Sequence, residues 1–248
     1  MKNNILTVFI FFSFLNGYSV FGHLYDAHSS AMGFAYASNI QNNKYNFLNP
    51  ASNQLSNDFY YSTFGDHFSG IFNSEQLYIS FQNKLGSFNL ALIRLGVDDI
   101  PNTITSWNDG NNNEIVEFDE IDYENISYYN QNELGMVLSY PFAIRKIPAG
   151  FNFKISRLDL LDYIAVTYGF DVGINYNLNY KLLNDTIELS NIAIVLKDIL
   201  NHRKWNNGTI EKKTVSTIIG TSVSYNNFTL NIDIQHNQNF EIYSGLEY

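Results

Sequence analysis

The sequence has no cysteine, few charged residues and no long apolar run. Without cysteine, no disulfide can hold an exported fold together. Charged residues make up only 15% of the chain, below the roughly 25% of ordinary globular domains. The 14 Lys and Arg and the net charge of −10 disfavour nucleic acid as a partner, because phosphate neutralisation needs clustered basic side chains. No apolar run reaches about 18 residues, so the sequence offers no helical membrane span.

What the sequence does contain favours strands. Aromatic residues make up 16% of the chain, with 18 Tyr and 20 Phe. Aromatic and β-branched residues are enriched in strands. The composition is therefore polar but weakly charged, and it predicts an all-β protein.

The first 22 residues have the pattern of a secretory signal peptide. Lys2 precedes an uncharged apolar run from Ile5 to Leu15, and Val20-Phe21-Gly22 offers small residues for a signal peptidase. The run is too short to cross a bilayer as a helix, which needs about 20 residues. The alternative is a buried N-terminal strand or helix. We expect export, with cleavage near Gly22.

Apolar and polar residues alternate with a period of two through most of residues 58–248. The longest row runs from Tyr168 to Tyr180, against an opposite face of Gly, Asn and Asp171. Such alternation indicates strands with one apolar and one polar face. Further rows occur at residues 77–82, 87–92, 134–140, 151–156, 215–225, 228–235 and 240–248.

The length of the rows decides between two architectures. A soluble β-sandwich uses strands of about 5–6 residues, whereas a transmembrane strand needs about 9–11, as several rows here provide. The polar face is also small and almost uncharged, as the interior of a barrel can be. The sequence predicts an antiparallel transmembrane β-barrel with about ten strands, in the outer membrane and in contact with its lipid. A secreted sandwich or jelly roll is the alternative.

The connections differ in length. Asn83-Lys84-Leu85-Gly86, Arg145-Lys146 and Asn226-Asn227 suit hairpin turns. This pattern predicts a long, polar, acidic loop at residues 96–130. It predicts a second, less pronounced loop at residues 200–213. Because outer-membrane barrels place long loops outside the cell, we expect the 96–130 loop there.

Residues 23–57 do not alternate. The stretch from Ser29 to Ala37 is small and apolar, and Asn49-Pro50-Ala51 reads as a turn or helix start. The segment is either a hatch packed inside the barrel or a short periplasmic arm. The chain then divides into a signal peptide (1–22), an N-terminal hatch or plug segment (23–57) and a barrel (58–248).

No residues form a convincing catalytic or metal-binding set. The five histidines are scattered, without the spacing of a zinc motif. Asp98, Asp99 and Asp109 are weak candidates for diffuse cation binding, and a solvated acidic loop is the plainer interpretation. We expect no enzyme activity and no cofactor.

Five short motifs, taken in order, resemble the PorV/PorQ family of outer-membrane proteins, which is related to the FadL-type barrels. They are Ala31-Met32-Gly33-Phe34-Ala35 with Asn49-Pro50-Ala51, the stretch from Leu95 to Thr103, Phe170-Asp171-Val172-Gly173, Leu196-Lys197-Asp198-Ile199, and Ser244-Gly245-Leu246-Glu247-Tyr248. The residues that carry the resemblance are Gly33, Asn49, Pro50, Asp98, Asp99, Pro101, Asp171, Gly173, Asp198, Gly245 and Glu247. Phe34 departs from the pattern, since the family favours a second glycine there.

The resemblance implies a 14-stranded barrel with an N-terminal hatch, and a role in type IX protein secretion in Bacteroidetes-like bacteria or in moving hydrophobic molecules. It implies secreted cargo proteins or other secretion components as partners. Strands normally follow the last motif in this family, so we expect the barrel to be C-terminally truncated.

Three functions are therefore open. The first is a PorV-type protein that delivers cargo to the cell surface. The second is a FadL-like channel for hydrophobic small molecules, and the third is a soluble exported β-sandwich that binds glycans or proteins.

Overall fold

The computed structural model describes most of the chain. The described residues are 20–39, 46–52, 59–69, 71–83, 86–103, 106–111, 113, 115, 117–182 and 187–248. Residues 1–19 of the expected signal peptide lie outside them, as do 40–45 and 53–57 of the expected hatch, and residue 58 and the Lys84-Leu85 turn of the expected barrel.

The described residues form one antiparallel sheet of eleven strands, which confirms the all-β expectation. The strands are β1 (Tyr60–Phe68), β2 (Phe72–Asn83), β3 (Gly86–Asn102), β4 (Ser127–Ile144), β5 (Ile147–Leu160), β6 (Tyr163–Leu182), β7 (Ile187–Trp205), β8 (Ile210–Lys212), β9 (Ser216–Tyr225), β10 (Phe228–His236) and β11 (Phe240–Glu247). Each pairs with its neighbour in chain order, except that β9 pairs with β7 and the short β8 is attached to β7 alone. The structure has a single sheet, whereas a sandwich needs two facing sheets.

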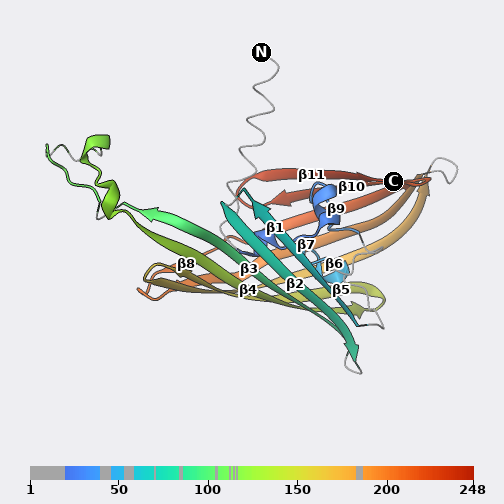
Figure 1. Ribbon diagram of the computed structural model, residues 1–248. Helices are drawn as coiled ribbons and strands as arrows, with labels where there is room; N and C mark the ends of the chain where they lie inside the picture. Colours follow the sequence, from blue (N-terminus) through green and yellow to red (C-terminus); the bar gives the residue numbers. More distant parts are fainter. Residues whose placement is uncertain are drawn as a thin grey trace, which may run out of the picture.

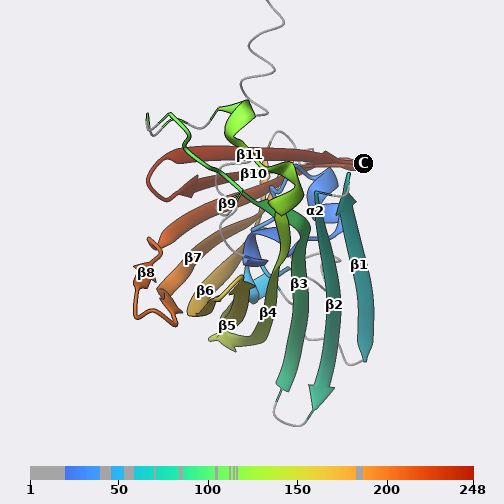
Figure 2. The same ribbon diagram turned by 60° about the vertical axis from the view of Figure 1, so that its left-hand side comes forward.

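The sheet curves around the N-terminal segment, by which we mean residues 20–39 and 46–52 (Figures 1 and 2). This segment contains η1 (Val20–His23), α2 (Ala27–Ala31) and η2 (Pro50–Ser52). Among the described residues β1 pairs with β2 alone and β11 with β10 alone, so the sheet is not closed. In Figure 2, α2 lies between these two edge strands.

The strand faces carry the opposite polarity to those of a water-soluble protein. On β6, the outward Val172 and Ile174 are 40% and 43% exposed. The inward Thr167, Asp171 and Asn175 are at most 3% exposed. Outward apolar side chains recur at Leu92, Leu134, Leu138, Phe151, Ile194, Ile219, Leu230 and Ile234, and inward polar ones at Asn89, Glu133, Asn152, Lys154, Asn191, Asp198, Asn231 and Asp233.

Two expected loops are shorter than the sequence pattern predicts. β3 continues to Asn102 and β4 begins at Ser127, so the irregular connection spans residues 103–126 rather than 96–130. The alternation breaks earlier because Asp98 and Asp99 form a bulge, where the register shifts between Val97 and Ile100. Similarly, β7 continues to Trp205 and turns back through β8, so residues 200–213 are largely a hairpin.

Two of the expected short turns lie at the same end of the sheet. Arg145-Lys146 and Asn226-Asn227 are two-residue turns, as expected. Both Arg145 and Lys146 have positive φ, of 48° and 79°, as a type I′ hairpin requires. Because successive strands are antiparallel, the long β3–β4 and β7–β9 connections both lie at the opposite end.

No helix among the described residues is long and apolar enough to cross a membrane.

Candidate functional site

The N-terminal segment packs closely against glycines on the inner face of the sheet. A Cβ on Gly150 would lie 2.5 Å from the Pro50 carbonyl, and one on Gly173 would overlap Asn49 Oδ1. Only glycine leaves room for such close backbone approach. The Asn49-Pro50 turn therefore rests directly on β5 and β6.

Asn49 is completely buried and organises this turn. Its Nδ2 donates to the Ala37 carbonyl at 2.8 Å, and its Oδ1 accepts from the Ala51 amide at 3.0 Å. From the sheet, Asn152 Nδ2 donates to the Phe47 carbonyl and Asn175 Nδ2 to the Ser38 carbonyl. The inward polar side chains thus satisfy the backbone of a segment that has no sheet pairing of its own.

The end of α2 meets β11 in the same way. Gly33 has a φ of 56°, and a Cβ there would lie 2.8 Å from the Ser244 carbonyl. Gly245 faces the Met32 backbone so closely that a Cβ would overlap it. His28 Nε2 lies 3.2 Å from Glu247 Oε1. The first and last motifs of the family resemblance are therefore in contact.

Phe34 follows Gly33 and also lies in the left-handed region, with a φ of 63°. A left-handed backbone costs a side-chain-bearing residue about 1–2 kcal/mol, so Phe34 is a strained position. The Phe34 ring packs edge-on against Tyr25, with centroids 5.4 Å apart.

A set of charges, the Lys154 cluster, joins the buried Lys154, Asp171 and Asp198 to Lys213, whose side chain is exposed. Lys154 Nζ lies 2.6 Å from both Asp171 Oδ1 and Asp198 Oδ1. Lys213 Nζ lies 2.7 Å from Asp198 Oδ2. Asp171 Oδ1 also accepts from the Asp198 amide at 2.9 Å. Both aspartates belong to motifs that the sequence shows, whereas neither lysine was expected to take part.

Bulges in β7 aim these groups inward. The register against β6 shifts between Phe170 and Val172, so Lys197 and Asp198 together face Asp171. Asp198 has a φ of 61°, and its side chain is 4% exposed. Such a strained backbone conformation persists only where the surrounding contacts hold the residue in place.

A second buried set, the Glu133 cluster, consists of Glu133, Ser156, Arg203 and the backbone nitrogen of Val20. Glu133 Oε1 accepts from Ser156 Oγ at 2.8 Å and from Arg203 Nη2 at 3.1 Å. Its other oxygen, Oε2, accepts from the Val20 nitrogen at 3.2 Å. Phe21 lies between the two clusters, with its ring centroid 5.7 Å from Lys154 Nζ.

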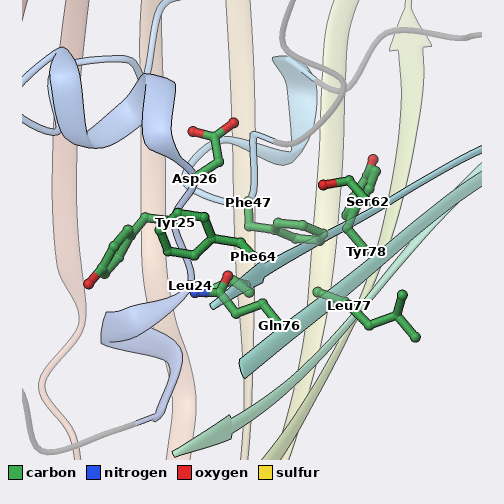
Figure 3. Close-up of a pocket in the computed structure, with 10 residues that line it drawn as sticks. Leu24, Tyr25, Asp26, Phe47, Ser62, Phe64, Gln76, Leu77 and Tyr78 are labelled. Atoms are coloured by element: carbon green, nitrogen blue, oxygen red, sulfur yellow. The ribbon is translucent and has the colours of Figure 1, made fainter. Parts of the chain in front are cut away.

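Between the N-terminal segment and strands β1 to β3 lies a small, mainly apolar cavity of about 30 Å³ (Figure 3). Leu24, Tyr25 and Phe47 face Phe64 and Tyr78 across it. Tyr25 is tied to β1 by a hydrogen bond from its hydroxyl to Asp66 Oδ2, at 3.0 Å. Burial, together with this bond, raises the pKa of Tyr25 to about 12. The cavity has room for about one water molecule.

His23 joins the segment to β2. Its carbonyl accepts from Gln76 Nε2 at 2.5 Å, and its ring meets Phe72 edge-on at 5.4 Å. Burial lowers the pKa of His23, and the carboxylates of Asp66 and Glu133 oppose this effect. The neutral imidazole is therefore the form that fits the docked segment.

A polar cavity of about 240 Å³ lies farther along the inner face, against β7, β9, β10 and β11. Asn191, Ser222 and Asn231 are among its lining residues. Its volume would hold several waters at roughly 30 Å³ each, and its lining suits water rather than an apolar ligand.

The remaining candidates do not assemble into a site. Asp98 and Asp99 lie in the β3 bulge and are exposed, while Pro101 is paired with Tyr128 near the end of β3. Asp109 Oδ1 accepts from the Asn113 amide at 3.1 Å within the β3–β4 connection. In the part of the chain that the structure describes, no three His, Cys, Asp or Glu lie close enough together to hold a metal ion.

The arrangement as a whole is a curved sheet whose polar inner face binds its own N-terminal segment through glycine contacts, amide hydrogen bonds and two ionic clusters. Comparisons with protein families, with curated proteins and with solved structures find no match.

Proposed function

We propose that this chain is an outer-membrane protein of the PorV/PorQ type that takes part in type IX secretion, where it delivers or receives cargo proteins at the cell surface. Lipid contacts the outward face of the sheet, and the N-terminal segment fills the interior.

The observation that carries the membrane part of the proposal is the inverted polarity of the strands. Burying an apolar side chain stabilises a protein by about 1.5–3 kcal/mol, yet the outward row of β6 leaves Val172, Ile174 and their neighbours at least 36% exposed. The inward row buries Asp171 and Asn175 instead. In lipid this distribution is the favourable one, because outward apolar side chains meet hydrocarbon.

The secretion part rests on the family resemblance, and the spatial arrangement of the motifs supports it. Asn49 and Pro50 touch Gly173, Asp171 joins Asp198, and Gly33 meets Gly245 through the neighbouring backbone. The motifs that carry the resemblance are far apart in sequence, yet their residues together hold the N-terminal segment inside the sheet. An interior filled in this way suits a surface-acting protein more than an open pore.

Fractionation tests the membrane part. The full chain, produced in a Gram-negative host, should remain in the outer-membrane pellet after a carbonate wash, and its gel mobility should change on heating. Release into the wash, with mobility independent of heating, would contradict the proposal in favour of a soluble exported protein.

Gene deletion in the native bacterium tests the secretion part. Deletion should leave secreted proteins in the periplasm, and the restored gene should return them to the surface. Normal secretion combined with lost uptake of a labelled fatty acid would instead assign the chain to the FadL-like channels.

A further inference from the structure

Val20 fills a space on the inner face of the sheet. It is completely buried and packs against Ile93 and Leu95 of β3. A Cβ on Gly135 would lie 2.7 Å from Val20 Cγ1, so Gly135 of β4 leaves the space that Val20 fills. Loss of Val20 would empty this space, and a cavity left by a buried aliphatic side chain destabilises the fold.

The backbone nitrogen of Val20 is equally well placed. It lies 3.2 Å from Glu133 Oε2, the oxygen opposite to the one that Arg203 and Ser156 contact. Glu133 is only 2% exposed. A cation beside a buried carboxylate interacts far more strongly than a neutral amide does, because the local dielectric is low.

The residues just before Val20 form a signal peptidase pattern. The apolar run ends at Leu15, and Gly17 and Ser19 then place small residues at the third and first positions before the Ser19–Val20 bond. These are the two positions at which the peptidase requires small side chains. Cleavage after Gly22, which the sequence pattern alone predicts, would instead remove Val20 and Phe21 with all of their interior contacts.

We propose that the chain is processed between Ser19 and Val20, and that the new α-ammonium group of Val20 pairs with Glu133 inside the sheet. A signal peptidase of the export pathway adds water across the Ser19–Val20 peptide bond. The carboxylate leaves with Ser19, and the ammonium stays on Val20. This inference rests on the export part of the proposed function.

Processing then has a structural consequence beyond release of the leader. The amide N–H that would otherwise face Glu133 becomes a charged donor, so cleavage strengthens the contact that anchors the start of the segment. The neighbouring Phe21, whose ring lies over Lys154, is held in place on the Lys154 cluster.

The test is the N-terminal sequence and intact mass of the protein recovered from a host that received the full chain. The expected sequence begins Val-Phe-Gly-His. A protein that begins at His23, or that keeps its leader, would overturn the inference. Fractionation of the same sample separates the two proposals, because a chain that begins at Val20 but lies outside the outer membrane contradicts the proposed function alone.

Paired variants locate the site independently. Ser19→Leu should block processing, and Gly22→Leu should leave it intact. The second variant is a matched control, because a Cβ on Gly22 meets nothing within 4 Å. The reverse result, with Gly22→Leu blocked and Ser19→Leu processed, would overturn the inference.

Amine labelling tests the pairing with Glu133. An amine-reactive reagent attacks only the unprotonated amine, so the native protein should be labelled at Val20 roughly tenfold more slowly than the unfolded protein. Glu133→Gln should remove most of that protection while leaving the cleavage position unchanged. Equal labelling of the native and unfolded wild-type protein would show that the α-ammonium is not held by Glu133.

Discussion

At the scale of single residues, Lys154 links three strands, because it contacts the carboxylates of Asp171 on β6 and Asp198 on β7 from its own place on β5. Lys154→Met removes the charge but keeps much of the length of the side chain. It leaves two carboxylates close together, with Lys213, which pairs with Asp198, and the nearby Lys197 as the remaining basic groups. Breaking a buried ion pair costs about 3–5 kcal/mol, and urea unfolding in detergent should show a loss of this order.

Arg157→Met is the matched control, because Arg157 lies on the same strand and its ion pair with Asp159 is exposed. Exposed pairs contribute little, so this variant should unfold at the wild-type urea concentration. Equal losses for the two variants would mean that the Lys154 cluster is not buried in the folded protein.

Gly150 offers a second test at this scale. Gly150→Ala places a methyl group against the Pro50 carbonyl, at a distance that forces the Asn49-Pro50 turn away from β5. The N-terminal segment should then become accessible to protease. Gly65→Ala is the control, because the nearest atoms to its Cβ lie 3.9 Å and 4.0 Å away. An undisturbed segment in Gly150→Ala would contradict the close approach.

Sequence reasoning found some of these residues and missed others for a physical reason. Asp171 and Gly173 stood out because they belong to the Phe170-Asp171-Val172-Gly173 motif, on the polar face of an alternating row. Lys154, Glu133 and Arg203 did not, because only the register between strands decides which inward charges meet. One signal was available, since Lys154 lies on a strand face otherwise made of small uncharged residues.

At the scale of the element, substitutions in the outward row of β6 test whether this strand faces lipid or solvent. Val172 lies at the middle of β6, and Tyr180 lies near its end. An arginine on the lipid face costs about 2–4 kcal/mol at the bilayer midplane and about 0–1 near the interface. Val172→Arg should therefore reduce membrane insertion strongly, and Tyr180→Arg only slightly.

The amount of heat-modifiable protein in the membrane pellet measures this difference. In a water-soluble protein, replacing an exposed valine with arginine improves solubility and leaves folding intact. A Val172→Arg variant that folds as well as the wild type would therefore contradict a lipid contact at this position.

The η1 element gives a prediction about pH. Burial lowers the pKa of His23 in the docked segment, whereas an undocked His23 titrates near 6.5. Docking is therefore fully stable above about pH 6.5 and weakens as the pH falls from there through the lowered pKa. Protease access to the segment should rise over this range, and His23→Gln should remove the dependence. Unchanged access in the wild type would contradict the burial of His23.

The strands themselves were predictable, because period-two alternation persists wherever one face is apolar. The rows at residues 168–180 and 228–235 lie within β6 and β10. The end of β3 and the start of β4 were not predictable, because the Asp98-Asp99 bulge shifts the alternation. The continuation of β7 to Trp205 was not predictable either, because the bulges of β7 also shift the alternation.

At the scale of the whole molecule, the two long connections lie at one end of the sheet, and the Arg145-Lys146 and Asn226-Asn227 turns lie at the other. The absence of cysteine from the sequence makes single-cysteine labelling unambiguous. Phe118→Cys and Asn207→Cys place exposed thiols in the β3–β4 and β7–β9 connections, and Asn227→Cys places one in the β9–β10 turn.

An impermeant maleimide applied to intact cells should label the first two variants and leave the third unlabelled. After the membrane is disrupted, all three should react. Labelling of Asn227→Cys in intact cells, with Phe118→Cys protected, would reverse the orientation. Equal labelling of all three in intact cells would contradict a membrane between the two ends.

The contacts of the N-terminal segment also determine when it can dock during folding. The segment is synthesised first, yet Ala37 binds Asp233 on β10, and His28 meets Glu247 on β11, across 196 and 219 residues of chain. Its final position therefore does not exist until β10 and β11 have been made and paired. Docking of the N-terminal segment follows the pairing of these two strands.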